Sequence, residues 1–153
     1  TAASEYFLMR SSDIVMDNFR LTGKYSFQYV ENVEITNSIL NTKDAFWHAK
    51  NVTVRDSVVN GEYLAWYSEN LTLINCTIKG TQPLCYCKGL KLINCEMIDC
   101  DLAFERSEVE AEITTPVISI KNPLSGRITV PDVGDIIRDI PGADGEVIIQ
   151  ALR

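Results

Sequence analysis

The chain has 153 residues, 46% hydrophobic and 23% charged, which is enough for one domain with a core and too few for two ordinary ones. Its 14 basic and 21 acidic residues give a net charge of −7, which argues against a nucleic-acid partner or an anionic membrane surface. No apolar run is long enough to span a membrane, and an odd number of cysteines, 5, disfavours a disulfide framework. We therefore expect a cytoplasmic protein with reduced thiols.

A repeat of nineteen residues starts at Asp13 and continues without gaps through four further starts, and we number the positions of each repeat as columns one to nineteen. Columns two and four are apolar, which predicts a short strand with two inward positions. Column six is a row of Asn and Asp, and column eleven contains glycines that suit turns. The repeat starts are Asp13, Asn32, Asn51, Asn70 and Gly89; column two holds Ile14, Val33, Val52, Leu71 and Leu90, and column six holds Asn18, Asn37, Asp56, Asn75 and Asn94.

A period near twenty with short β segments and polar turns is typical of a β-solenoid, in which each coil lies over the last. Like residues then stack about 4.8 Å apart, so the Asn columns can form hydrogen-bonded ladders along the axis. The fold expected is all-β: a single-stranded right-handed parallel β-helix with stacked coils over residues 1–114.

The segment 115–153 differs in composition, since it holds four of the five prolines and no aromatic residue. It predicts a C-terminal cap. Val133, Ile136, Ile137 and Ile140 have helical spacing between two prolines, which predicts a short amphipathic helix over 132–140. Residues 1–9 enter in mid-coil, so we expect either preceding coils in a longer solenoid or a homodimer through the uncapped first coil.

Several motifs resemble a bacterial family of single-stranded right-handed β-helix proteins, the domain of unknown function 3737. The motifs are Glu62-Tyr63-Leu64-Ala65-Trp66-Tyr67-Ser68, Gly80-Thr81-Gln82-Pro83-Leu84-Cys85-Tyr86, Asp101-Leu102-Ala103-Phe104-Glu105 and Ser119-Ile120-Lys121-Asn122-Pro123. The resemblance covers the chain from about Glu5 to Ile137. It implies the β-helix fold, a cytoplasmic bacterial protein and the C-terminal half of a longer chain, and it supplies no catalytic residues.

Columns thirteen to eighteen hold the unusual residues, and we read them as a strand in which columns thirteen, fifteen and seventeen share one face. If column sixteen points inward, Trp47 stacks on Trp66 in the core; the residues leave open whether column fifteen or sixteen is buried. The outward face would then bind a polysaccharide or a protein partner by ring stacking and hydroxyl hydrogen bonds. The candidate ligand-binding residues are Tyr25, Tyr29, Tyr63, Tyr67 and Tyr86.

Two other uses of the chain stay open. The alternative to a non-catalytic binding or scaffolding module is a polysaccharide hydrolase or lyase, whose carboxylates would be Asp44, Glu62, Asp101 or Glu105, with His48 as a candidate general base. Against a lyase, the lysines Lys43, Lys50, Lys79 and Lys88 are scattered. The third use is a structural spacer that assembles end to end.

No cofactor or metal is expected, because the five cysteines lack the paired spacing of a metal site. We expect them to be buried thiols that behave as small hydrophobic residues.

Overall fold

The computed structural model describes residues 1–151 and consists of strands and turns, with no helix in that part of the chain. None of the described residues therefore forms a helix that could cross a membrane. The strands are β1 (Ala2–Glu5), β2 (Ser12–Asp17), β3 (Arg20–Lys24), β4 (Glu31–Thr36), β5 (Ile39–Lys43), β6 (Lys50–Arg55), β7 (Val58–Asn60), β8 (Glu69–Ile74), β9 (Thr77–Lys79), β10 (Leu90–Ile98), β11 (Glu108–Ile113), β12 (Val117–Lys121), β13 (Ser125–Val130), β14 (Val133–Ile137) and β15 (Glu146–Ile149).

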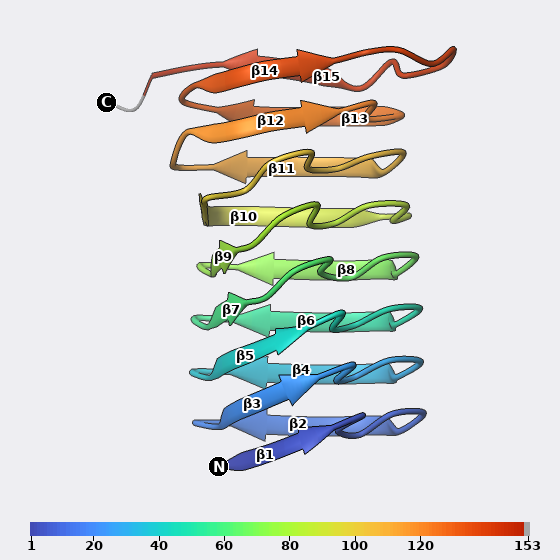
Figure 1. Ribbon diagram of the computed structural model, residues 1–153, viewed down its shortest axis with the longest axis vertical. Coiled ribbons are helices and arrows are strands. Elements are labelled where there is room, and N and C mark those ends of the chain that lie inside the picture. The colour runs from blue at the N-terminus through green and yellow to red at the C-terminus, as the bar shows by residue number, and fades with distance from the viewer. Residues whose placement is uncertain (152–153) are drawn as a thin grey trace.

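The strands form a right-handed parallel β-helix of about eight turns, whose coils lie one above another (Figure 1). Strands β1, β3, β5, β7 and β9 run along one side and β2, β4, β6 and β8 along another, and the long strand β10 joins both rows. From β1 to β10, partners in neighbouring coils are nineteen residues apart, as Val33 is from Val52 and Val52 from Leu71. Beyond β11 the separation falls to seventeen between β11 and β13 and to sixteen between Val117 and Val133. The fold expected from the repeat is confirmed.

The core is one continuous apolar column along the axis. In β4, Val33 and Ile35 are 1% and 0% exposed, whereas Glu34 between them faces solvent. The same alternation recurs in β6 and β8, because every coil places columns two and four over those of the coil before. A one-residue slip would turn this whole apolar set outward, so the register is strongly fixed.

Amide ladders run along the outside of the stack, as expected. Asn32 donates to Asp13 over 3.2 Å, Asn51 to Asn32 over 3.3 Å and Asn70 to Asn51 over 2.8 Å. All four residues have φ between 55° and 58°, a left-handed conformation that Asn and Asp tolerate better than most residues. The sixth column carries a second ladder, in which Asn94 donates to Asn75 over 2.8 Å.

The helix expected over 132–140 is wrong: strand β14 occupies Val133–Ile137 and pairs with β12, with Val117 opposite Val133 and Ile120 opposite Ile136. An isolated segment this short, bounded by prolines, is too short to form a stable helix in water. Strand β12 offers an open edge of backbone groups, and β-branched residues suit that edge. Residues 115–150 therefore continue the stack, and they cover the coil below with strands.

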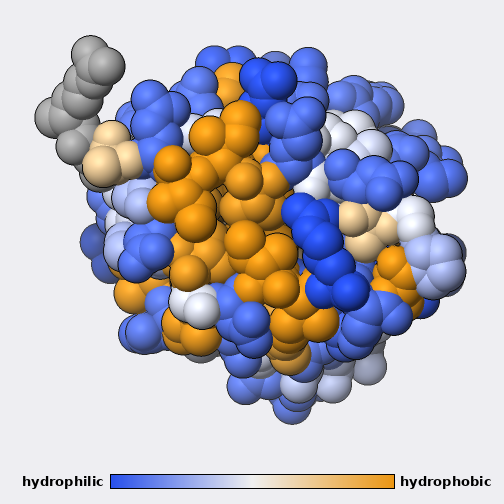
Figure 2. Space-filling model, turned by 90° about the horizontal axis from the view of Figure 1, so that it is seen from above, coloured by the Kyte–Doolittle hydropathy of each residue, from blue (hydrophilic) through white to orange (hydrophobic). Residues whose placement is uncertain are grey.

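The C-terminal end of the stack is apolar. Positions of the core that are buried one coil below are partly exposed to solvent here. Ile120 is 0% exposed, whereas its partner Ile136 on the last coil is 37% exposed. Val130 is 0% exposed, whereas its partner Ile149 is 56% exposed. Figure 2, which looks onto this end, shows apolar side chains gathered at its centre within a polar rim.

Candidate functional site

The segment that carries the aromatic residues is a turn segment and not the strand expected from the sequence. Every second residue is left-handed: Tyr25, Phe27 and Tyr29 have φ of 60°, 59° and 58°. The side chains therefore do not alternate between two faces as they do in an extended strand, and column fifteen does not share a face with column seventeen. Column fifteen lies in the core, where Phe27 and Phe46 are 0% and 1% exposed and stack 4.7 Å apart.

Column seventeen forms a continuous outer stack that we call the aromatic ladder: Arg10, Tyr29, His48, Tyr67 and Tyr86. Successive ring centroids lie 4.8, 5.0 and 4.8 Å apart from Tyr29 to Tyr86, with interplanar angles of 7°, 6° and 11°. The Arg10 guanidinium lies 4.6 Å from the centre of the Tyr29 ring and closes the lower end of the ladder. Four of the candidate residues, Tyr29, His48, Tyr67 and Tyr86, are thus brought together.

The geometry of the ladder changes what it can bind. Because each ring lies face to face with the next, the faces of the inner rings are occupied and their edges point outward. A sugar cannot stack on these faces as the sequence analysis expects. What the ladder offers a ligand is a row of ring edges, phenol hydroxyls and imidazole nitrogens.

The two tryptophans stack as expected, but they are half-buried and lie beside the core. Their ring centroids are 5.2 Å apart with an interplanar angle of 1°. The indole N–H of Trp47 donates to the Tyr63 carbonyl over 2.6 Å, and that of Trp66 to the Gln82 carbonyl over 2.8 Å. Tyr63 meets the Trp66 ring edge-on at 5.4 Å. Each indole thus forms a hydrogen bond between one coil and the next.

Tyr25 lies in column thirteen, apart from the ladder. Its ring stacks on Tyr6 at 5.0 Å, and the Lys43 ammonium lies 5.8 Å from its centre on the other side. The five candidate tyrosines therefore divide into three settings: the ladder, the edge of Trp66 and this separate pair.

Asp101 and Glu105 are displaced from the columns that the gapless repeat gives them. The Gln82 N–H donates to the Asp101 carbonyl, where the Tyr63 N–H donates to Thr81 of column twelve. The Tyr86 N–H donates to Glu105, where the Tyr29 N–H donates to Trp47 of column sixteen.

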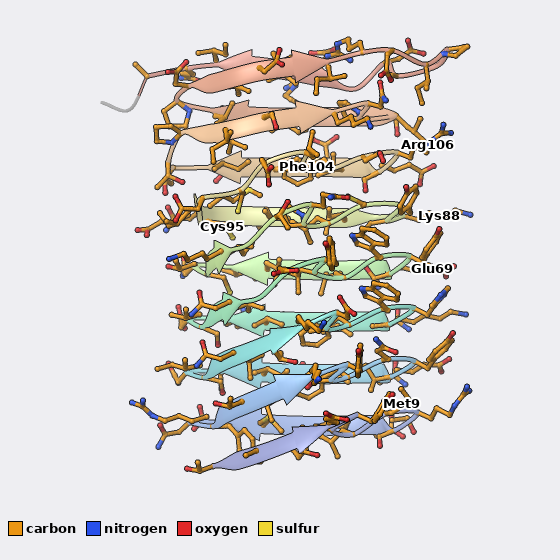
Figure 3. The ribbon with its side chains drawn as sticks, viewed as in Figure 1. Met9, Glu69, Lys88, Cys95, Phe104 and Arg106 are labelled. Carbon is orange, nitrogen blue, oxygen red and sulfur yellow. The ribbon has the colours of Figure 1, made fainter. Side chains whose placement is uncertain are left out.

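One additional residue therefore lies before Asp101 in the coil that begins at Gly89, which is the sixth coil when residues 1–12 are counted as the first. Strand pairing still has a separation of nineteen at Ile98 and Lys79, so the extra residue follows Ile98. Phe104 consequently falls in the buried column fifteen, while Arg106 points outward at the margin of the stack (Figure 3).

Both oxygens of the Glu105 carboxylate are occupied. The Tyr86 hydroxyl donates to Oε1 over 3.2 Å, and Lys121 Nζ lies 3.6 Å from Oε2. Burial, together with the negative charge of Glu105, raises the pKa of Tyr86, so the phenol stays protonated and keeps donating. Glu105 therefore ends the ladder as a structural ion pair and is not set up for proton transfer.

Asp44 and Glu62 lie close together on consecutive coils. One oxygen of Asp44, Oδ1, is buried without a hydrogen-bond partner. Burial raises the pKa of Asp44, Lys43 lowers it, and the negative charge of Glu62 raises it again. Two neighbouring carboxylates in unlike settings, one of them shifted toward the protonated form, are what acid–base chemistry on a polysaccharide requires.

A groove of about 620 Å³, which we call the axial groove, runs along the solenoid axis beside this pair of carboxylates. Asn41 and Asn60 lie in one row of its lining, and the Asn60 amide donates to Asn41 over 2.9 Å. Lys24 and Lys43 lie in a neighbouring row as partners on adjacent coils. The lining residues are Ser4, Glu5, Thr22, Gly23, Lys24, Asn41, Thr42, Lys43, Asn60 and Gly61.

Glycine makes the floor of the groove. A Cβ on Gly23 would lie 1.7 Å from the Ser4 carbonyl oxygen, and one on Gly61 would lie 1.9 Å from that of Thr42. The backbones of successive coils therefore touch at column eleven and leave a furrow. The sequence analysis interpreted the column-eleven glycines as turn residues and counted Lys43 among scattered lysines. Glycines that recur in one column beside Lys24 and Lys43 were the signal for a groove.

The five cysteines are buried and free, as expected. Burial raises the pKa of Cys85 to about 12 and that of Cys87 to about 11. Within residues 1–151, no group of three or more His, Cys, Asp or Glu side chains is placed to hold a metal ion.

The parallel coils, amide ladders and stacked aromatic column define a β-helix protein of the solenoid class. The model of a family described as "Protein of unknown function (DUF3737)" matches residues 1–150, so this chain belongs to that family, which the sequence motifs had indicated. No curated protein matches the chain, and no solved structure does.

Proposed function

We propose that this chain is a non-catalytic binding module that holds an extended polysaccharide in the axial groove. The observation that supports this proposal is the direction of the groove. It runs across four coils, so a chain of repeating hydroxylated units would meet polar groups again at each rung, about 4.8 Å further on.

The hydrogen-bonding capacity of the groove fits such a ligand. Asn60 donates to Asn41, which leaves the Asn41 amide hydrogens and the Asn60 carbonyl oxygen for a sugar hydroxyl. Lys43 makes no ion pair within the described residues, and its ammonium faces the Tyr25 ring. The groove can therefore donate to and accept from the same ligand, with a cation beside it.

The aromatic residues have a supporting part in this proposal. Tyr25 stacks on Tyr6 and lies under Lys43, so it holds one wall of the groove in place. A rigid wall lowers the side-chain entropy lost when a ligand binds.

The experiment is calorimetric titration of the chain with a neutral glucan and with polygalacturonate. We expect saturable binding of at least one polymer, weakened about tenfold by Asn60→Ala or Lys43→Ala, because each removes one hydrogen bond or charge contact.

Matched controls are Asn51→Ala, which interrupts the column-one amide ladder, and Lys91→Ala, which removes an exposed cation from another side of the stack. Both should bind as the parent chain does. Equal losses in Asn51→Ala and Asn60→Ala, or no binding of either polymer, would contradict the proposal.

A polysaccharide hydrolase is the second candidate, and the observation that favours it is Asp44 with its buried oxygen next to Glu62 at the side of the groove. Asp44 would act as the acid and Glu62 as the base or nucleophile. The test is release of reducing ends from whichever polymer binds. Asp44→Asn should abolish release and keep binding; binding without any release by the parent chain would exclude this candidate.

A further inference from the structure

A second hollow, of about 370 Å³, lies on the other side of the turn segment, away from the axial groove. It is lined by Arg10, Tyr29, Glu31, His48 and Lys50, which come from three successive coils. Three of these five residues are basic, in a chain whose net charge is −7. A concentration of basic groups in a depression of an acidic protein calls for a physical explanation.

Arg10 is held in position and still has free donors. The central carbon of its guanidinium lies over the Tyr29 ring, 4.6 Å from the centroid. This contact occupies none of the guanidinium N–H donors with a hydrogen bond, so they stay available for an oxyanion. Arg10 forms no ion pair with any residue in the range 1–151.

His48 and Lys50 supply the remaining basic groups. The imidazole is fixed between Tyr29 and Tyr67, with centroids 4.8 and 5.0 Å away, and its ring edge faces outward. Lys50 is the strand partner of Glu31 on the preceding coil and of Glu69 on the following coil, yet no ion pair joins it to either within 4.0 Å. By contrast, Lys24, Lys79, Lys121 and Arg127 each pair with a carboxylate.

The local charge favours an anion even though Glu31 is present. Among the lining residues, Arg10 and Lys50 carry two positive charges against the one negative charge of Glu31; Glu69, the strand partner of Lys50 on the following coil, lies outside the lining. We propose that this hollow binds an oxyanion group, a phosphate, sulfate or carboxylate, between the Arg10 guanidinium and the Lys50 ammonium. The site is separate from the axial groove, so either proposal can fail alone.

The test is a titration of the full chain with sodium phosphate, sulfate and acetate at constant ionic strength, followed by NMR shifts of the Arg10 and His48 side chains. Comparison of the three dissociation constants shows whether the site prefers a phosphate, a sulfate or a carboxylate group. We expect saturation with a dissociation constant on the order of 1 mM, since the site is open to water, and weaker binding as sodium chloride is raised.

Two variants and a control decide the outcome. Arg10→Gln and Lys50→Gln should each weaken binding about tenfold, because each removes a charge-assisted hydrogen bond. Lys88→Gln, in the same column as Lys50 two coils away and pointing outward in Figure 3, should change nothing. Lys50 makes no contact in the aromatic ladder, so its variant tests the site even if Arg10→Gln disturbs the first coil. Linear, non-saturating shifts, or equal effects of Lys50→Gln and Lys88→Gln, would overturn the proposal.

Discussion

At the residue scale, this fold places many non-glycine residues in the left-handed region. His48 and Tyr67 have φ of 56° and 62°, and Ala65 between them in column fifteen has 63°. Each such residue costs about 1 kcal/mol relative to ordinary backbone. Ring stacking, at about 0.5–1.5 kcal/mol per aromatic pair, offsets a cost of this size, which is a physical reason for aromatic residues at these positions.

The buried thiols predict a loss of stability in alkali. Burial raises the pKa of Cys85 and Cys87 from 9.0 to about 12 and about 11. The folded chain therefore holds these protons more tightly than the unfolded chain, so their contribution is complete below about pH 8 and is lost as the pH rises through 9 toward 11. Urea unfolding between pH 7 and 10.5 should show a flat region and then a decline of up to about 1.4 kcal/mol per pH unit for each thiol.

Cys87→Ser is the control for this effect, because a hydroxyl does not titrate in that range. Its stability should be lower at pH 7 and should decline less steeply above pH 9. A decline as steep as that of the parent chain would mean that other groups cause it.

At the element scale, the aromatic ladder acts as a support for the coils. Tyr67 is 46% exposed and yet stacks on both His48 and Tyr86. We expect Tyr67→Ala to destabilise the chain by about 1–3 kcal/mol, because two stacked contacts are lost. Arg10→Ala, which removes one contact at the end of the ladder, should cost less. Thermal unfolding of both variants checks this order, and an unchanged stability of Tyr67→Ala would show that the ladder contributes nothing to the fold.

The strands could be predicted from the sequence, whereas the turn segment could not. Columns two and four alternate with polar residues as a strand requires, so Val33 and Ile35 identify the core side directly. The turn segment has the same two-residue period, but its period comes from alternating φ. The sequence therefore wrongly gives columns fifteen and seventeen one face and leaves open whether column fifteen or sixteen is buried; Phe46 of column fifteen is in the core.

The extra residue in the sixth coil could not be predicted from the sequence either. The gapless register puts Phe104 after Cys85 and Glu105 after Tyr86, and both assignments are chemically plausible. The backbone hydrogen bonds of Gln82 and Tyr86 reveal the shift, so the columns that the sequence gives to Asp101 and Glu105 rested on a wrong alignment.

At the scale of the whole molecule, the C-terminal end of the stack is a surface on which another chain can pair. Among residues 1–151, β15 pairs with β13 alone, and Ile149 is 56% exposed. Apolar strand edges pair with other chains unless a charge opposes it.

We expect Ile149→Lys to reduce self-association, because it places a charge at the apolar end of the stack. Light scattering of concentrated samples over time measures this effect. Ile93→Lys, a substitution at a side chain 43% exposed on the flank of the stack, is the matched control and should associate as the parent chain does. Equal self-association of the two variants would mean that another surface of the chain causes it.

The extra residue in the sixth coil also bears on how the chain finds its own pairing. Coils of nineteen residues with the same apolar columns are nearly interchangeable, and a strand that paired one coil too far along would still bury the correct side. The residue inserted after Ile98 breaks this equivalence locally, since a shifted stack would place it against a coil that has none, although the separation returns to nineteen at Leu90 and Val109. The separations of seventeen residues between Val109 and Gly126 and of sixteen between Val117 and Val133 distinguish the C-terminal coils further. These irregular coils thus give the uniform stack before them a fixed reference point from which each strand's neighbour is defined.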